Sequence, residues 1–170
     1  MVILVGIMGS GKSVLGNRLA DTLDVPFMDT DQLFVNRMGR PIAQWFRHYG
    51  EDSFREHETS ILRSLEPEPA VLSTGGGIVL RPENWQEMKR LGATVYLDVP
   101  PSAIKARLAQ SKRRRPLLEF EDWEERFDKI YAERRPIYQQ ADITVNLDFE
   151  EIDEAVRSIV EQLGHKWGAA

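Results

Sequence analysis

The feature that most constrains this chain is a glycine-rich octapeptide close to its start. Residues 6–13 read Gly-Ile-Met-Gly-Ser-Gly-Lys-Ser, which matches the pattern G-x-x-x-x-G-K-[ST]. The apolar run 2–5 precedes it and apolar residues at helical spacing follow over 12–23, so the sequence predicts strand, glycine loop and helix. Glycines let the backbone N–H groups turn inward around phosphate oxygens, and the helix adds the positive end of its dipole. The octapeptide therefore predicts a nucleotide phosphate site.

The polar groups of this loop have expected roles. Lys12 is expected to bridge the β- and γ-phosphates, and Ser13 to offer its hydroxyl to Mg²⁺, the implied cofactor. The expected contacts to ATP are Gly9, Ser10, Gly11, Lys12, Ser13 and Val14. Because P-loop proteins include GTPase switches, motor ATPases and small-molecule kinases, other residues must identify the reaction.

The rest of the chain alternates short apolar runs with helical patterns, which predicts an α/β fold with a parallel sheet covered by helices. The expected strands are 2–5, 25–28, 70–73, 93–97 and 143–145. The expected helices are 12–23, 31–38, 42–48, 51–65, 82–90, one that starts at 101, 121–139 and 150–163. Residues 111–120 are basic and contain proline, which is typical of a mobile flap, and 164–170 carry no readable signal. One domain over 1–170 is expected.

Bulk composition excludes several classes of protein. The chain has 170 residues, of which 42% are apolar, and this size suits one domain with a buried core. Its formal net charge of -5 argues against nucleic acid or an anionic membrane surface as the main partner. It has no cysteine, and its three histidines fit no zinc spacing. No run approaches ~20 apolar residues, and the start does not fit a secretory signal, so a cytoplasmic location is expected.

Two aspartates after the second expected strand favour a kinase over a GTPase switch. The chain has no Asp-x-x-Gly and no Asn-Lys pair, which a GTPase would need. Asp29 and Asp31 instead follow the strand at the sheet edge where the phosphates are expected. Asp29 is suited to hold Mg²⁺ through water, and Asp31 to accept a hydrogen bond or a proton from an attacked hydroxyl. The alternative is that they cap the helix that begins near residue 32.

Arginines beside carboxylates and aromatic residues suggest an anionic acceptor. A guanidinium can hold a substrate carboxylate through two hydrogen bonds, and Glu58, three residues beyond Arg55 on one helical face, can fix that guanidinium. Glu133 and Arg134 precede a Pro-Ile-Tyr segment in a similar setting. Residues 75–77 are all glycine and would let an acceptor reach backbone amides. Taken singly, each arginine could be a solvated ion-pair partner, and the glycine run could be a flexible turn.

A basic run at 112–115, followed by Pro116, allows three interpretations. It could be a nucleic-acid patch, a solvated face, or a lid that closes over phosphates. The negative net charge weakens the first. Phosphoryl transfer favours the third, because a cation that arrives on closure neutralises developing charge and excludes water. Arg115 is the predicted lid residue, since Pro116 fixes the chain beside it.

In this order, these segments resemble the shikimate kinase family of the nucleoside-monophosphate-kinase-like P-loop group. The likeness covers about residues 2–163 and rests on GIMGSGKS, Asp29-Thr30-Asp31, Phe54-Arg55 with Glu58, Ser73-Thr74 before three glycines, Arg115 before Pro-Leu-Leu, and Glu133-Arg134 before Pro136-Ile137-Tyr138. The resemblance implies transfer of the γ-phosphoryl group of ATP to the 3-hydroxyl of shikimate, a step toward chorismate and the aromatic amino acids.

Carried over residue by residue, the resemblance implies Lys12, Asp31 and Arg115 as catalytic residues, with Arg115 also on the ATP phosphates. The implied shikimate contacts are Asp31, Arg55, Gly76 and Arg134, and Phe46 and Phe54 would line that pocket. It also implies a three-layer fold with sheet order 2-3-1-4-5, an acceptor-binding section at 31–65 and a lid at 111–120. We expect a monomer whose partners are the small molecules ATP and shikimate.

Two positions depart from the family pattern. Val14 stands where many members have threonine, and Leu108 where many have an arginine that stacks on adenine; Arg107 is one position away. The remaining alternatives are a related kinase for another hydroxy acid such as gluconate, or for a nucleoside monophosphate. A further alternative is a protein that binds ATP as a conformational signal and transfers no phosphoryl group. The last alternative is a nucleic-acid binder, whose affinity for oligonucleotides would depend steeply on salt.

Overall fold

Five parallel strands form one sheet in the order β2-β3-β1-β4-β5. The computed structural model describes residues 1–110, 121–147 and 152–166. The strands are β1 (Val2–Val5), β2 (Phe27–Asp29), β3 (Val71–Ser73), β4 (Ala93–Asp98) and β5 (Ile143–Asn146). This order confirms the topology that the family resemblance implies. All four residues of β1 are buried, as its continuous apolar run predicts for a central strand.

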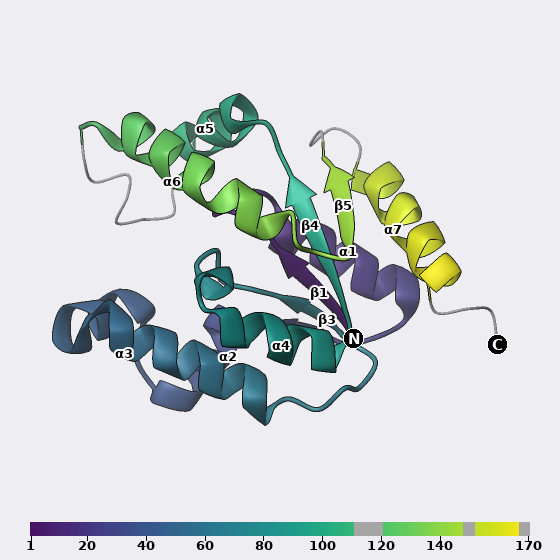
Figure 1. Ribbon diagram of the computed structural model, residues 1–170, viewed down its shortest axis with the longest axis horizontal. Coiled ribbons are helices and arrows are strands. Elements are labelled where there is room, and N and C mark those ends of the chain that lie inside the picture. Colours follow the sequence, from purple (N-terminus) through teal and green to yellow (C-terminus); the bar gives the residue numbers. More distant parts are fainter. Residues whose placement is uncertain (111–120, 148–151, 167–170) are drawn as a thin grey trace.

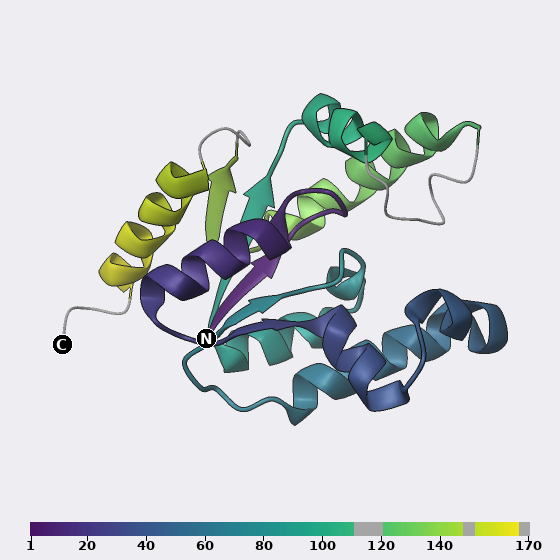
Figure 2. The same cartoon turned by 180° about the vertical axis from the view of Figure 1, so that it is seen from behind.

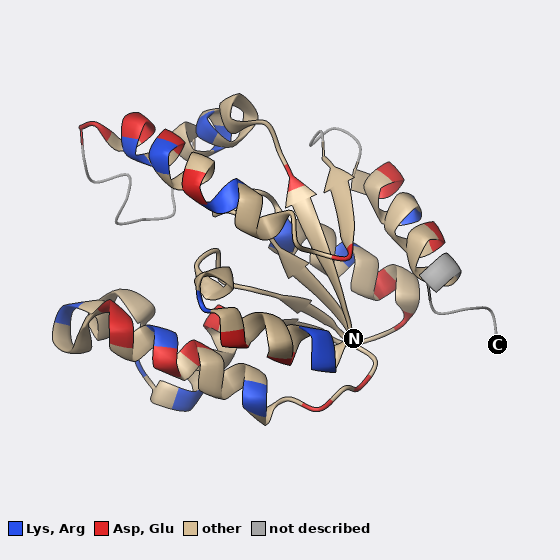
Figure 3. Cartoon of the chain, viewed as in Figure 1, with Lys and Arg blue, Asp and Glu red and all other residues tan. Residues whose placement is uncertain are grey.

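Helices cover both faces of this sheet, which gives three layers (Figures 1 and 2). The helices are α1 (Lys12–Leu23), α2 (Thr30–Met38), α3 (Ile42–Ser64), α4 (Pro82–Leu91), α5 (Pro101–Gln110), α6 (Trp123–Tyr138), α7 (Ile152–Lys166) and the short 3₁₀ helix η1 (Ile78–Leu80). α1 and α7 lie side by side on one face, and α4 and α6 lie on the other. Figure 3 shows both signs of charge along α3 and α6, whereas the strands are nearly uncharged.

The register of the sheet brings three strand ends together at one edge. Asp29, the last residue of β2, pairs with Ser73, the last residue of β3, and Ser73 pairs with Leu4 of β1. The phosphate loop (residues 6–13) leaves from β1, and the glycine turn (residues 75–77) leaves from β3. Parallel pairing therefore places both loops, and the start of α2, at the same edge of the sheet.

The start of α2 differs slightly from the sequence prediction, and the break within α3 agrees with it. α2 begins at Thr30 rather than near residue 32, and its N-cap is Asp29, whose carboxylate accepts a hydrogen bond from the Asp31 N–H at 2.9 Å. Asp31 therefore lies in the first turn, and the alternative that Asp31 caps this helix is wrong. α3 consists of two helical segments that meet at Gly50, whose φ of 78° and ψ of 175° are not helical, so the two helices predicted on either side of Gly50 are confirmed.

α2 and α3 build a small apolar core beside the main one. Phe34, Phe54 and Ile61 are buried in it, and Trp45 and Phe46 pack against them. The Phe34 ring centroid lies 4.9 Å from that of Phe54 and 5.4 Å from that of Trp45, both in edge contacts. Phe54 is only 4% exposed, so its ring supports this core. Among the described residues, no helix is long and apolar enough to cross a membrane.

We predict that replacing Gly16 of α1 destabilises the fold. An added Cβ would lie 2.6 Å from the Phe27 ring and 3.0 Å from a Leu4 methyl group. Alanine favours a helix by about 1 kcal/mol over glycine, but overpacking costs about 1–3 kcal/mol. Gly16→Ala should therefore lower the free energy of unfolding by up to about 2 kcal/mol in urea denaturation.

The matched control is Gly164→Ala in α7, where an added Cβ meets nothing within 4 Å. This change should stabilise the protein by about 0.5–1 kcal/mol. A stabilised Gly16→Ala protein would show that α1 can move away from β2 without cost.

Candidate active site

The phosphate loop folds around the side chain of Lys12. Gly9 and Gly11 adopt φ values of 83° and 89°, in the left-handed region that only glycine enters freely, and Gly11 is the N-cap of α1. Lys12 is 8% exposed, and its Nζ donates to the carbonyls of Gly6 at 2.7 Å and Ile7 at 2.9 Å. The ammonium group thus lies inside the loop, at the N-terminus of α1. The charge of Lys12 and the positive end of the helix dipole would both attract a phosphate.

α5 supports the outside of this loop. A Cβ on Gly9 would lie 2.9 Å from Ile104 and 3.2 Å from Leu108, so these side chains pack directly on the loop backbone. Leu108 is 2% exposed, whereas Arg107 is exposed near the end of α5. Leu108 therefore serves in packing against the phosphate loop.

Ser13 and Asp29 bring a hydroxyl and a carboxylate together beside the phosphate loop. Ser13 Oγ lies 3.4 Å from Asp29 Oδ2, while Asp29 Oδ1 caps α2. Both groups are oxygen donors of the kind that Mg²⁺ prefers. Val14 is 54% exposed, so no packing requirement fixes its side chain.

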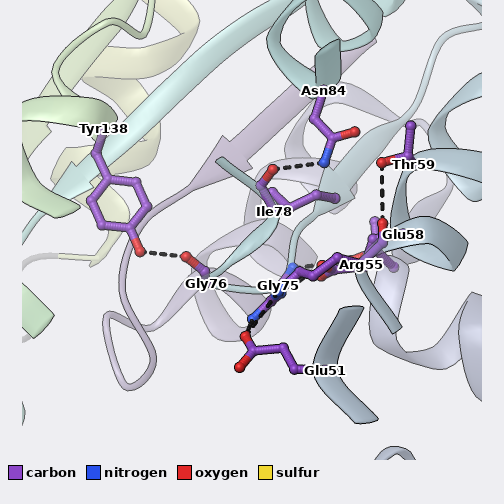
Figure 4. Close-up of polar contacts among 10 residues, drawn as sticks. Glu51, Arg55, Glu58, Thr59, Gly75, Gly76, Ile78, Asn84 and Tyr138 are labelled. Atoms are coloured by element: carbon purple, nitrogen blue, oxygen red, sulfur yellow. Dashed lines mark hydrogen bonds and ion pairs between the residues drawn. The ribbon is translucent and has the colours of Figure 1, made fainter. Parts of the chain in front are cut away.

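The guanidinium of Arg55 is clamped by two glutamates. Nη1 donates to Glu58 Oε2 at 2.5 Å, and Nη2 donates to Glu51 Oε1 at 2.7 Å (Figure 4). Its Cζ also lies 5.3 Å from the centre of the Phe54 ring. These contacts hold the planar fork on the face of α3 that looks toward the glycine turn, as the spacing of Arg55 and Glu58 predicts.

The glycine turn is where these side chains converge. A Cβ on Gly75 would lie 2.8 Å from Glu58 Oε1 and 3.1 Å from Asp31 Oδ1, and one on Gly77 would lie 2.2 Å from Arg55 Nη2. The carboxylates of Asp31 and Glu58 thus meet the guanidinium at a surface without side chains. The structure brings Asp31, Arg55 and the glycine turn together, as the sequence predicts.

The hydrogen bonds of the turn leave the amide of Gly76 available to a ligand. The carbonyls of Gly75 and Gly77 accept hydrogen bonds from the amides of η1, and the Gly76 carbonyl accepts one from Tyr138. The Gly75 N–H donates to Thr30 Oγ1 at 2.9 Å. Within the described part of the chain, the amides of Gly76 and Gly77 have no such partner; Gly76 is partly exposed and could donate to an acceptor, whereas Gly77 is buried.

Glu58 is a buried carboxylate with one oxygen unsatisfied. Its side chain is 2% exposed, and among the described residues its Oε1 has no hydrogen-bond partner. Burial raises the pKa of Glu58 to about 7, although Arg55 acts in the opposite direction, and the nearby Asp31 and Glu51 charges raise it further. An unsatisfied buried acceptor costs folding free energy, and such groups are typical of sites that a ligand completes.

α6 carries two neighbouring arginines with different partners. Arg135 Nη2 donates to Asp98 Oδ2 at 2.7 Å, and the hydroxyls of Tyr96 and Tyr131 donate to the other oxygen of Asp98. Burial alone would raise the pKa of Asp98, but these donors outweigh it and hold the pKa below its usual value. Arg134 instead lies near Tyr138: burial raises the pKa of Tyr138 to about 12, and the charge of Arg134 opposes that rise. The structure thus separates an anchoring arginine from the predicted acceptor arginine.

A cavity of about 630 Å³ opens beside this anchor, at the ends of β4 and β5. It is lined by Asp98, Pro100, Pro101, Tyr131, Arg135, Asn146 and Leu147. None of these is a predicted site residue.

Some predicted residues cannot be placed, and some contacting residues were not predicted. Arg115 and the rest of the predicted lid lie outside the described residues. No role was predicted for the Thr30 hydroxyl, the Tyr138 hydroxyl or the Asp98–Arg135 pair, although Thr30 and Tyr138 lie within segments that carry the family resemblance. Tyr138 lies on the apolar face of its helix, and a buried tyrosine hydroxyl needs a hydrogen-bond partner. The sequence could therefore have indicated that Tyr138 makes a buried hydrogen bond, but not with which residue.

The phosphate loop lies next to the glycine turn, where an arginine and two carboxylates meet. This arrangement is typical of the P-loop kinases of small molecules, and the fold and site place the chain in that class. Sequence comparison gives the family. The sequence model described as shikimate kinase matches residues 8–164. A shikimate kinase of Synechococcus sp. is 45% identical over 88% of this chain and 79% of that protein, and one of Xanthomonas euvesicatoria is 39% identical over 98% and 93%. The chain belongs to the shikimate kinase family.

Solved structures agree in fold. The shikimate kinase of Acinetobacter baumannii, solved in complex with shikimate, aligns with a TM-score of 0.90 at 31% identity, over 99% of this chain and 94% of that one. The enzyme of Bacteroides thetaiotaomicron aligns at 0.87 and 34% identity, over 95% and 97%. A gluconokinase of Sinorhizobium meliloti aligns at 0.61 with 16% identity, over 98% and 94%, which reflects a shared fold alone.

We predict that Glu58 makes the stability of the unliganded protein fall as pH rises from about 4.5 to about 7. In this window the folded protein retains a proton that the unfolded chain has released, so raising the pH favours unfolding. The difference in unfolding free energy between wild type and Glu58→Gln should fall by up to about 3 kcal/mol across it, measured by urea denaturation at several pH values. A difference that does not change with pH would show that the pKa of Glu58 is the same in the folded and the unfolded protein.

We also predict that Gly77→Ala weakens the acceptor site without affecting the phosphate loop. The new Cβ would overlap the Arg55 guanidinium. Because this guanidinium is the end of a flexible side chain, it can move away, but it would then lose its ion pairs with Glu51 and Glu58. We expect the KM for the acceptor to rise at least about tenfold, since charged hydrogen bonds are worth about 1.5–3 kcal/mol. The KM for ATP should stay within about twofold, and an equal rise in both would contradict this assignment.

Proposed function

We propose that this chain transfers the γ-phosphoryl group of ATP to the 3-hydroxyl of shikimate, giving ADP and shikimate 3-phosphate. The observation that carries the proposal is the convergence of Asp31, Arg55 and Glu58 on a glycine turn that packs against the phosphate loop. The Arg55 cation and the partly exposed amide of Gly76 suit a carboxylate that also carries hydroxyl groups. Membership of the shikimate kinase family supports this acceptor.

On the donor side, the loop amides and Lys12 bind the phosphates of ATP, with Gly9, Ser10, Gly11 and Val14 along the same backbone. Ser13 and Asp29 would hold Mg²⁺, Asp29 through water, because their oxygen donors lie 3.4 Å apart beside the loop. The bound ion would neutralise negative charge on the β- and γ-phosphates. Magnesium usually keeps several waters and few protein ligands, so this sparse pair fits it.

On the acceptor side, Arg55 and Arg134 bind the carboxylate and the amide of Gly76 contacts a hydroxyl. Asp31 accepts a hydrogen bond from the attacking hydroxyl and takes its proton as the new bond forms. The hydroxyl oxygen bonds to the γ-phosphorus while the bond from that phosphorus to the β–γ bridging oxygen breaks, and ADP leaves. Catalysis comes from positioning and charge neutralisation, with no covalent enzyme intermediate.

We further propose that the acceptor-binding section, residues 31–65, and a lid at 111–120 belong to one domain spanning 1–170. The separate apolar core of α2 and α3 supports the first assignment. Closure of Arg115 over the phosphates is proposed from the sequence alone.

The direct test is ADP release coupled to a spectrophotometric assay, with shikimate as acceptor. Arg55→Ala should lower kcat/KM for shikimate at least about 30-fold, equal to ~2 kcal/mol of transition-state stabilisation. The matched control is Arg63→Ala on the same helix, whose side chain is 60% exposed and 3.6 Å from Glu87. Surface pairs contribute little, so activity should stay within about twofold.

Gluconate and nucleoside monophosphates in the same assay separate the related kinases. ATP hydrolysis that is independent of any acceptor, with no phosphorylated product, would instead identify a signalling ATPase. Unchanged kinetics in Arg55→Ala would remove Arg55 from the acceptor site.

A further inference from the structure

The hydroxyl of Tyr138 lies at the back of the glycine turn. Tyr138 is the last residue of α6, is 1% exposed, and donates a hydrogen bond to the Gly76 carbonyl at 2.5 Å (Figure 4). Burial raises its pKa to about 12, while the charges of Arg134 and Arg55 act to lower it. The phenol is therefore neutral at physiological pH and lies close to both guanidinium groups that the proposed function assigns to the acceptor carboxylate.

This hydrogen bond fixes the direction of an amide donor. The Gly76 carbonyl and the Gly77 N–H belong to one planar trans peptide, so they point in opposite directions. Holding the carbonyl toward Tyr138 turns the Gly77 N–H away from Tyr138. Two glycines in succession would otherwise allow this peptide to rotate, because neither has a Cβ to restrict it.

The same contact sits directly behind the phosphate loop. A Cβ on Gly76 would lie 3.2 Å from the Met8 nitrogen and 3.4 Å from the Gly6 carbonyl oxygen. Gly76 is thus held between the loop and the Tyr138 hydroxyl. The position of the glycine turn relative to the γ-phosphate of bound ATP depends on both contacts.

The ring of Tyr138 is fixed separately from its hydroxyl. It stacks on the ring of Tyr96, with centroids 5.2 Å apart and planes at 16°. The Tyr96 hydroxyl points elsewhere and donates to Asp98 at 2.9 Å, and Asp98 is also held by Arg135 and Tyr131. The two stacked tyrosines therefore offer a comparison in which only one hydroxyl reaches the acceptor wall.

We propose that the Tyr138 hydroxyl is a positioning group for the acceptor, acting through the Gly76–Gly77 peptide and Arg134. It would not touch ATP or the transferred phosphoryl group. The inference rests on the proposed function in one respect, that the acceptor bound at this wall is shikimate. Its consequence is that removing the hydroxyl impairs acceptor binding and leaves nucleotide binding intact.

The test compares Tyr138→Phe with Tyr96→Phe, each of which deletes one buried hydroxyl and keeps the ring stack. Tyr138→Phe leaves the Gly76 carbonyl without this donor, so the KM for shikimate should rise about tenfold while the KM for Mg-ATP stays within about twofold. Tyr96→Phe should leave both KM values within about twofold, because Asp98 keeps Arg135 and Tyr131. The rise in melting temperature on adding each ligand can be measured even if a variant is less stable. For Tyr138→Phe, the rise caused by shikimate should be smaller than in the wild type, and the rise caused by Mg-ATP should be unchanged.

Several outcomes would overturn the proposal. One is an active Tyr138→Phe enzyme with an unchanged KM for shikimate and an unchanged shikimate shift. Another is an equal rise in both KM values in both variants together with a lower melting temperature, which would assign the hydroxyl to stability alone. Failure of the proposed function looks different, because the wild type would then neither bind nor phosphorylate shikimate, and the positioning role would fall with it.

Discussion

The close approach of the glycine turn to the backbone of the phosphate loop is the contact on which the rest of the site depends. Gly76 lies so near Met8 that a single Cβ would reach 3.2 Å from its nitrogen. Both segments leave neighbouring parallel strands at the same edge of the sheet, so their separation is set by strand pairing. Any acceptor bound on the turn is then held next to any phosphate bound in the loop, which is the main requirement for in-line transfer.

The charges around this contact are arranged at a cost to folding. Glu58 is buried with one oxygen unsatisfied, and its partner Arg55 is mostly buried too, with 14% of its side chain exposed. Buried ion pairs seldom stabilise a fold, because desolvation offsets the attraction. Their presence here is better explained by the need for a guanidinium with a fixed direction. The small aromatic core of α2 and α3 offsets part of this desolvation cost, and the Phe54 ring of that core packs against the Arg55 guanidinium.

Much of the fold could be predicted because its signals are local. Buried apolar runs gave the strands, and Gly50 gave the kink of α3. The sequence leaves the N-cap of α2 open because Asp29 and Asp31 are both good caps, and only the geometry shows that Asp29 is used. Within the site, Arg55 and Glu58 could be paired from helical spacing, whereas the contact of Tyr138 with Gly76 joins residues 62 positions apart and depends on how α6 packs.

The two arginines at the end of α6 show how packing gives different roles to neighbouring residues of one type. Sequence spacing alone cannot separate Arg134 from Arg135, since both follow Glu133 and precede Pro136. Because consecutive residues of a helix point about 100° apart, only one of them can face the Asp98 carboxylate at the end of β4. Arg135 takes that place, and with it α6 is anchored to the sheet. Arg134 lies instead near Tyr138, so a single ion pair is enough to give two neighbouring arginines different surroundings.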